Sequence, residues 1–171
     1  MPYTNGQYKA PVWFSHFLDI NGDQTGSIEG NGDYSVTPRV LFIQPPSNEI
    51  FVINRLIGAV HDNGNFTSSI YGANAAVTNG VDIQIKRDGE SLVNLTNGRP
   101  VKDNGSWPDF CYDVDVSNYS GNDNYLHFRW TFEKAGAPLI LNGAEGDTFE
   151  VTLSDDYTFL TEHRYVVQGY S

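Results

Sequence analysis

The 171-residue sequence lacks the features that are typical of disulfide-bonded, membrane-spanning and secreted proteins. It has one cysteine, Cys111, which excludes an internal disulfide and any cysteine-based metal spacing. No apolar run approaches the roughly 20 residues that span a bilayer, so we expect no contact with a membrane interior. The first residues, Met1-Pro-Tyr-Thr, lack a basic stretch followed by an apolar one. This start predicts a protein made in the cytoplasm without a signal peptide.

Positive charge is also scarce. Ten Lys and Arg face 21 Asp and Glu, which gives a formal net charge of −11. A surface of this sign repels phosphate backbones and anionic lipid, so we expect neither nucleic acid nor a membrane surface as a partner. Asn, Gly and Asp are abundant, which favours many turns and few helices.

Catalytic motifs are missing as well. There is no phosphate-binding loop, no GxGxxG and no GxSxG, and the four histidines are scattered. Asp113 and Asp115 share a strand face at roughly 6.5–7 Å, a separation that glycoside hydrolysis can use. In so acidic a chain, a solvated strand face is the favoured interpretation. We therefore predict no enzymatic activity and no cofactor.

Oxygen-bearing side chains alternate from Asp19 to Ser27. Asp19, Asn21 and Asp23 follow the spacing of a calcium loop. Gln24 occupies the place where that loop requires glycine, Glu29 comes one position too early, and no helix is expected on either side of the loop. A structural turn is therefore favoured, with these three residues kept as calcium candidates.

What the sequence does have is strand alternation. In Tyr125–Glu133 the apolar side chains Leu126, Phe128, Trp130 and Phe132 fall on one parity and polar ones on the other. This pattern is typical of a half-buried antiparallel strand, which we expect at the centre of a sheet. Its polar face, with His127 and Arg129, is the part that could touch a partner.

Further strands are expected at 12–18, 39–44, 50–60, 81–86, 91–95, 110–116, 148–153 and 163–169, with a bend at Asn54 and Arg55. The lone cysteine excludes the disulfide arrangement of immunoglobulin domains. We predict an all-β fold, with residues 13–171 forming one antiparallel two-sheet sandwich of jelly-roll type. Residues 1–12 are expected to form an extended N-terminal arm.

Aromatic residues outside the strand pattern are the candidates for partner contacts. They are Tyr3, Tyr8 and Trp13 in and beside the arm, and Phe66 and Tyr71 in the long connection from His61 to Gly80. Connections longer than about 12–15 residues are usually functional or mobile. We expect this one to contain a short helix or to pack against a neighbouring copy.

Four blocks together resemble small jelly-roll structural proteins of tailed-phage virions, of the capsid decoration (cement) or head-fibre type. They are Ile70-Tyr-Gly-Ala-Asn-Ala-Ala-Val-Thr-Asn-Gly-Val81, Phe110-Cys-Tyr-Asp-Val114, Phe128-Arg-Trp-Thr-Phe-Glu-Lys-Ala-Gly136 and His163-Arg-Tyr-Val-Val-Gln-Gly-Tyr170. The resemblance implies a non-enzymatic protein on the capsid surface of the virion. It also implies a homotrimer bound to the major capsid protein or another virion protein.

Two other functions stay open at this point. A carbohydrate-binding or adhesin module would use loop aromatics, for which Trp107 and Tyr119 are the candidates, with calcium in the Asp19–Ser27 loop. A glycan-active enzyme would depend on Asp113. One fold hosts many functions, so the fold alone does not separate these alternatives.

Overall fold

The computed structural model describes residues 10–111, 113–117, 124–132 and 138–171. Strands account for most of its regular structure. They are β1 (Trp13–Phe17), β2 (Arg39–Ile43), β3 (Ile50–Asp62), β4 (Ile70–Tyr71), β5 (Asn74–Ala75), β6 (Val81–Arg87), β7 (Glu90–Asn94), β8 (Asp113–Ser117), β9 (Asn124–Thr131), β10 (Leu139–Asn142), β11 (Asp147–Leu153) and β12 (Glu162–Tyr170). Two short 3-10 helices, η1 (Asn104–Asp109) and η2 (Gly143–Glu145), complete the regular elements. Among the described residues, no helix is long and apolar enough to cross a membrane.

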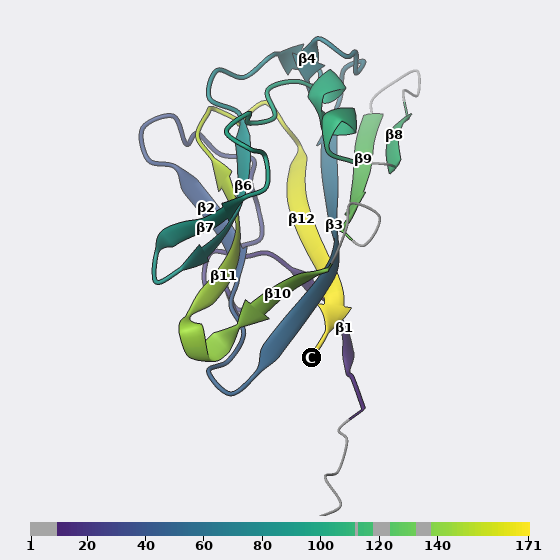
Figure 1. The fold of residues 1–171 in the computed structure, drawn as a ribbon. Helices are drawn as coiled ribbons and strands as arrows, with labels where there is room; N and C mark the ends of the chain where they lie inside the picture. Colours follow the sequence, from purple (N-terminus) through teal and green to yellow (C-terminus); the bar gives the residue numbers. More distant parts are fainter. Residues whose placement is uncertain (1–9, 112, 118–123, 133–137) are drawn as a thin grey trace, which may run out of the picture.

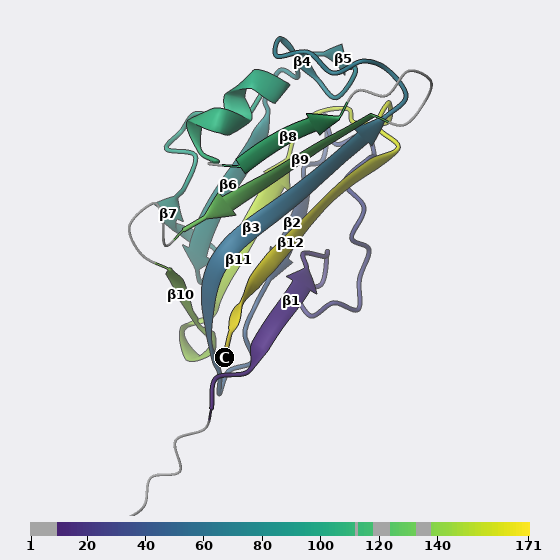
Figure 2. The ribbon, with the colours of Figure 1, turned by 90° about the vertical axis from the view of Figure 1, so that its right-hand side faces the viewer.

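Ten of these strands form two facing antiparallel sheets (Figure 1), and β4 and β5 pair separately. Sheet A has the order β1-β12-β3-β9-β8, and β10 also pairs with β3; sheet B has the order β2-β11-β6-β7. The predicted all-β sandwich is confirmed. Figure 2 shows sheet A face-on, with β1 at one edge and β8 at the other.

The centre of sheet A is β3 rather than the aromatic strand β9, so that expectation was wrong. β3 pairs with β12, β9 and β10. The near-continuous apolar sequence of β3 suits a strand in the middle of the sheet. β9 lies one position from the edge, between β3 and the edge strand β8. The predicted irregularity at Asn54 is confirmed, because Gln168 pairs with Arg55 while Gly169 pairs with Ile53. At this bulge the neighbour of β3 also changes from β9 to β10.

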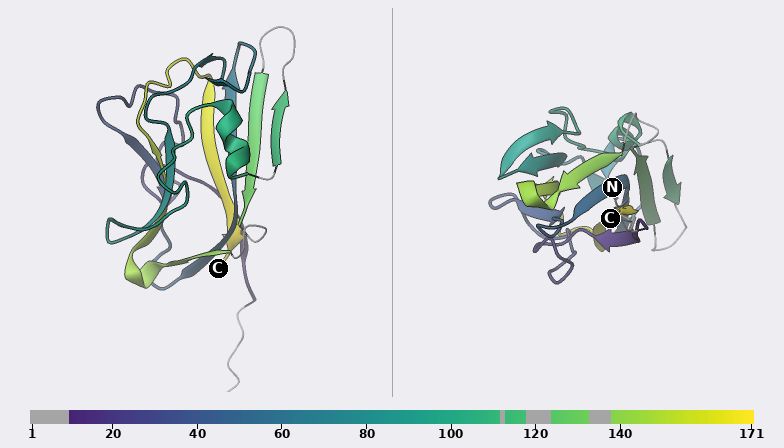
Figure 3. Two further views of the ribbon diagram at one scale, coloured as in Figure 1. Left: turned by 45° about the horizontal axis from the view of Figure 1, so that its top comes forward. Right: turned by 60° about the horizontal axis from the view of Figure 1, so that its bottom comes forward.

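The alternation read from the sequence determines which side chains fill the sandwich. In β9, Leu126 and Phe128 are buried while His127 and Arg129 are exposed. In β11, Phe149, Val151 and Leu153 are fully buried. Helix η1 lies beside β9 on the side that faces sheet B (Figure 3), and its Trp107 stacks on Phe128 with 3.7 Å between ring centroids.

Four local features differ from what the sequence pattern predicts. The strand expected from Phe110 begins at Asp113, because the chain up to Asp109 forms η1. Alternation along residues 110–116 would place Cys111 on the outer face, but Cys111 is buried, and burial raises the pKa of its thiol to about 12. The same alternation would place Val116 inside, but Val116 is 41% exposed because β8 is an edge strand. The connection from His61 to Gly80 contains β4 and β5 in place of a helix.

Candidate functional site

The first candidate is the open edge of β1. Val12 and Ser171 exchange two backbone hydrogen bonds of 3.0 Å, and the Leu18 N–H donates to the Tyr165 carbonyl at 2.9 Å. Backbone groups alternate in direction along an antiparallel ladder, so those of Trp13, Ser15 and Phe17 point away from β12. Within the described residues, no other strand pairs with β1 on that side.

Edge strands are usually protected by charge, proline or a bulge. The β1 sequence, Trp-Phe-Ser-His-Phe, contains no Lys, Asp, Glu or Pro. Trp13 is 68% exposed and Phe17 is 42% exposed. β1 is therefore an uncharged template on which another extended segment can pair.

The second candidate is a groove on the outer face of sheet A, close to this edge. It has a volume of about 400 Å³ and is lined by Trp13, Phe14, Ser15, Asn54, Arg55 and Gln168. Ser15, Gln168 and Arg55 lie directly across from one another on β1, β12 and β3. The bulge at Asn54 brings two neighbouring polar residues of β3 to the groove.

A third feature lies near the other edge of the same face. A shallow groove of about 490 Å³ is lined by Asp113, Asp115, His127 and Arg129 together with Ile57, Val114 and Phe128. The structure thus brings the predicted carboxylate pair next to the predicted partner face. Arg129 and Asp113 approach to 3.8 Å, but both side chains are about half exposed. An exposed ion pair of this kind contributes only about 0–1 kcal/mol.

The calcium candidates form a hydrogen-bonded turn. Asp19 is fully buried, and its two carboxylate oxygens accept the backbone N–H groups of Gly22 at 2.6 Å and Gly26 at 2.5 Å. Asp23 Oδ1 accepts both the N–H and the hydroxyl of Thr25, and Asn21 donates to the same hydroxyl. The Thr25 contacts lower the pKa of Asp23. Within the described residues, no group of three His, Cys, Asp or Glu side chains is placed to hold a metal ion.

Two predicted contact aromatics lie inside the chain's own core. Phe66 is 4% exposed and Tyr71 is fully buried, so the expectation that they would be exposed was wrong. The loop folds back over the end of the sandwich and uses both rings as core. Trp107, the sugar candidate, is also fully buried, so it offers no surface for stacking. Trp13 is exposed, whereas Tyr3, Tyr8 and Tyr119 lie outside the described residues.

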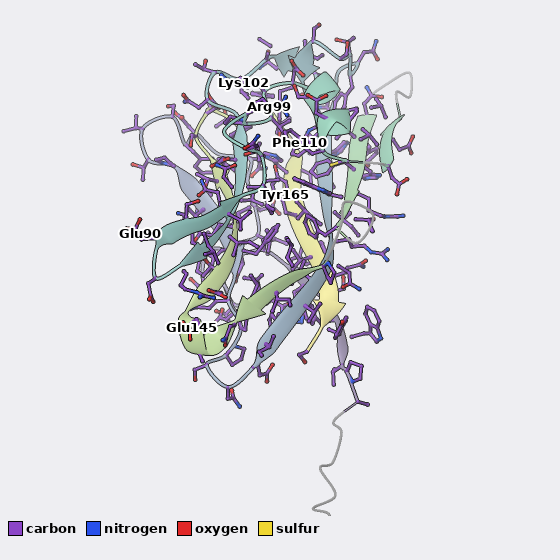
Figure 4. All side chains as sticks on the ribbon, viewed as in Figure 1. Glu90, Arg99, Lys102, Phe110, Glu145 and Tyr165 are labelled. Atoms are coloured by element: carbon purple, nitrogen blue, oxygen red, sulfur yellow. The ribbon has the colours of Figure 1, made fainter. Side chains whose placement is uncertain are left out.

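Sequence reasoning missed a buried polar cluster around His163. Its Nδ1–H donates to the Gly30 carbonyl at 2.9 Å, which leaves Nε2 as an acceptor. The hydroxyls of Tyr71 and Tyr165 lie 2.8 and 2.7 Å from Nε2. Figure 4 shows Tyr165 in the interior of the sandwich. Burial lowers the pKa of His163 to about 4 and raises those of both tyrosines.

Asp155 anchors the end of the long connection. Its carboxylate accepts the backbone N–H groups of Thr78 at 3.0 Å, Asn79 at 3.0 Å and Gly80 at 2.7 Å. These contacts hold the connection against the sandwich, and both carboxylate oxygens of Asp155 accept hydrogen bonds.

Comparisons with known proteins give no further assignment. No family model, curated protein or solved structure matches the chain. The arguments for function therefore rest on the open edge, the grooves and the buried cluster of this chain.

Proposed function

We propose that the protein is a non-enzymatic structural component of a tailed-phage virion, attached to the outside of the head as a decoration protein. The observation that carries the proposal is the open edge of β1. In the homotrimer that the resemblance implies, linked copies would contact neighbouring sites on one particle, so a weak contact of each copy adds up to firm attachment.

The strand order supports the jelly-roll part of the resemblance. The chain passes from one sheet to the other at most connections, and β6 and β7 form a hairpin within sheet B. Sheet A contains β1, β12, β3, β9, β8 and β10, and sheet B contains β2, β11, β6 and β7. Two facing antiparallel sheets with repeated crossings between them are compatible with a jelly roll.

Attachment would occur by strand addition. An extended segment of the shell protein would pair with the outward N–H and C=O groups of Trp13, Ser15 and Phe17, which supply affinity through main-chain hydrogen bonds. The uncharged edge suits such pairing, since the rest of the chain carries a net charge of −11. The acidic surface also fits a component held outside a shell filled with DNA.

Co-sedimentation tests this proposal. Purified protein is mixed with mature heads of the phage that encodes it, after accessory proteins have been stripped from the heads. Saturable binding at a fixed number of copies per head is expected. A protein that stays in the supernatant at every concentration would contradict the attachment role.

A further inference from the structure

The groove beside β1 has the composition of a binding site for a charged sugar. Trp13 presents a largely exposed indole, which is fixed edge-on against Tyr170 with ring centroids 5.3 Å apart. Aromatic faces of this kind pack against the apolar C–H face of a ring-shaped ligand. The other two tryptophans, Trp107 and Trp130, are buried.

Arg55 supplies the charge. The other arginines in the described residues have ion-pair or ring partners, which are Tyr34 for Arg39, Asp147 for Arg87, Phe110 for Arg99, Asp113 for Arg129 and Glu29 for Arg164. No such contact is found for Arg55 in the described part of the chain. Among the described residues, no carboxylate lines its groove either. A half-buried guanidinium that has no ion-pair or ring partner among these residues is suited to a carboxylate from a ligand.

The remaining groups suit sugar hydroxyls. Gln168 Nε2 donates to Ser15 Oγ at 3.3 Å, which leaves the Gln168 carbonyl oxygen as an acceptor and the Ser15 hydroxyl as a donor. Asn54 is only 8% exposed, and its Oδ1 has no hydrogen-bond partner among the described residues. That oxygen has almost no accessible surface, so the polar groups open to a ligand are those of Gln168 and Ser15.

The dimensions agree with one sugar unit and its acidic group. Neighbouring strands lie about 4.8 Å apart, so the backbone of Ser15 on β1 is about 10 Å from that of Arg55 on β3. Trp13 is two residues from Ser15 on the same face, at about 7 Å. An indole platform, a central amide and hydroxyl, and a guanidinium thus follow one another across the groove.

We propose that this groove binds a carboxylate-bearing saccharide, with the sugar ring on Trp13 and the carboxylate on Arg55. This inference is independent of the attachment proposed above. Strand addition uses backbone groups in the plane of the sheet, whereas these side chains project from its outer face. A copy attached through its β1 edge therefore keeps the groove open.

The probes are trigalacturonate, the same trisaccharide with its carboxylates reduced to alcohols, and sialyllactose. Binding is followed by calorimetry and by tryptophan fluorescence at 0.15 M salt, where charges further apart than about 8 Å are largely screened. Trigalacturonate should change the fluorescence of Trp13 and bind at least about tenfold more tightly than its neutral counterpart. Tighter binding of sialyllactose would assign the carboxylate to a terminal acidic sugar rather than to a polymer of uronic acids.

Variants identify the groove. Arg55→Gln should weaken trigalacturonate binding at least about tenfold, and Arg55→Lys should retain part of it because a lysine keeps the charge without the paired donors. Arg39→Gln, which removes an arginine from sheet B, is the matched control and should bind like the wild type. Equal binding of the neutral and acidic sugars, full binding by Arg55→Gln, or no response to either acidic sugar would overturn the proposal.

Discussion

Lowering the pH from 7 to 4 should reduce the free energy of unfolding by about 3 kcal/mol through one buried histidine, His163. Its Nδ1–H is bound to the Gly30 carbonyl, and the ring lies fully inside the core. Burial lowers its pKa from 6.5 to about 4 in the folded chain. The unfolded chain takes up a proton below pH 6.5, while the folded chain does so only near pH 4.

The magnitude follows from this interval. Each pH unit between the two pKa values contributes about 1.4 kcal/mol, so about 2.5 units give about 3 kcal/mol. The contribution of His163 to the free energy of unfolding is complete above pH 6.5 and is lost progressively as the pH falls toward 4. Domains of this size lose about 2–4 °C of melting temperature per kcal/mol, which predicts a fall of about 6–12 °C.

Urea unfolding at pH 7, 6, 5 and 4 measures the effect in the wild type and in His163→Gln. The variant should be less stable than the wild type at pH 7, and the difference should shrink by about 3 kcal/mol at pH 4. His127→Gln, which removes an exposed histidine, is measured alongside as the control. Parallel loss of stability in the wild type and His163→Gln would refute the reasoning.

Three further predictions concern packing and the loops. Gly58→Ala should destabilise the fold by about 1–3 kcal/mol in thermal unfolding, because a Cβ there would lie 1.9 Å from the Phe128 ring, which Trp107 holds from the other side; an unchanged melting temperature would contradict this packing. Asp155→Ala should lower the free energy of unfolding by about 3 kcal/mol or more, because it leaves three backbone N–H groups without an acceptor, each worth about 1–3 kcal/mol. It should also increase amide hydrogen exchange at residues 78–80, and unchanged protection there would show that other contacts hold the connection. Calcium and EDTA should leave the melting temperature unchanged, because both Asp19 oxygens already accept backbone N–H groups; a rise with calcium would reinstate the calcium loop.

Much of the sandwich could be predicted because its strands have local signals. β9 and β11 alternate strictly, and the alternation alone indicates which side chains are buried. The polar residue Asn54 inside the apolar run of β3 indicated an irregularity, which is the bulge. The long connection gave no such signal, since Phe66 and Tyr71 occur in a stretch without periodicity and their burial depends on tertiary packing.

The sites were less accessible to sequence reasoning. Trp13 could be selected as an isolated aromatic beside the arm. Its association with Arg55 and Gln168 depends on the pairing of β1 with β12 and of β12 with β3, and no local pattern encodes that register. The sequence pattern likewise identifies His163 only as part of a strand, because its partners come from Gly30 and Tyr71, which are distant in the sequence.

Co-sedimentation with stripped heads, repeated for two variants of Ser15, tests the proposed attachment most directly. The Ser15 N–H points to the open edge, so Ser15→Pro removes a donor for strand addition without removing a bond to β12. Ser15→Ala keeps this N–H and serves as the matched control. The account predicts that Ser15→Ala sediments with the heads like the wild type, while Ser15→Pro, folded by circular dichroism, loses binding. Full binding of Ser15→Pro would contradict attachment through the edge of β1.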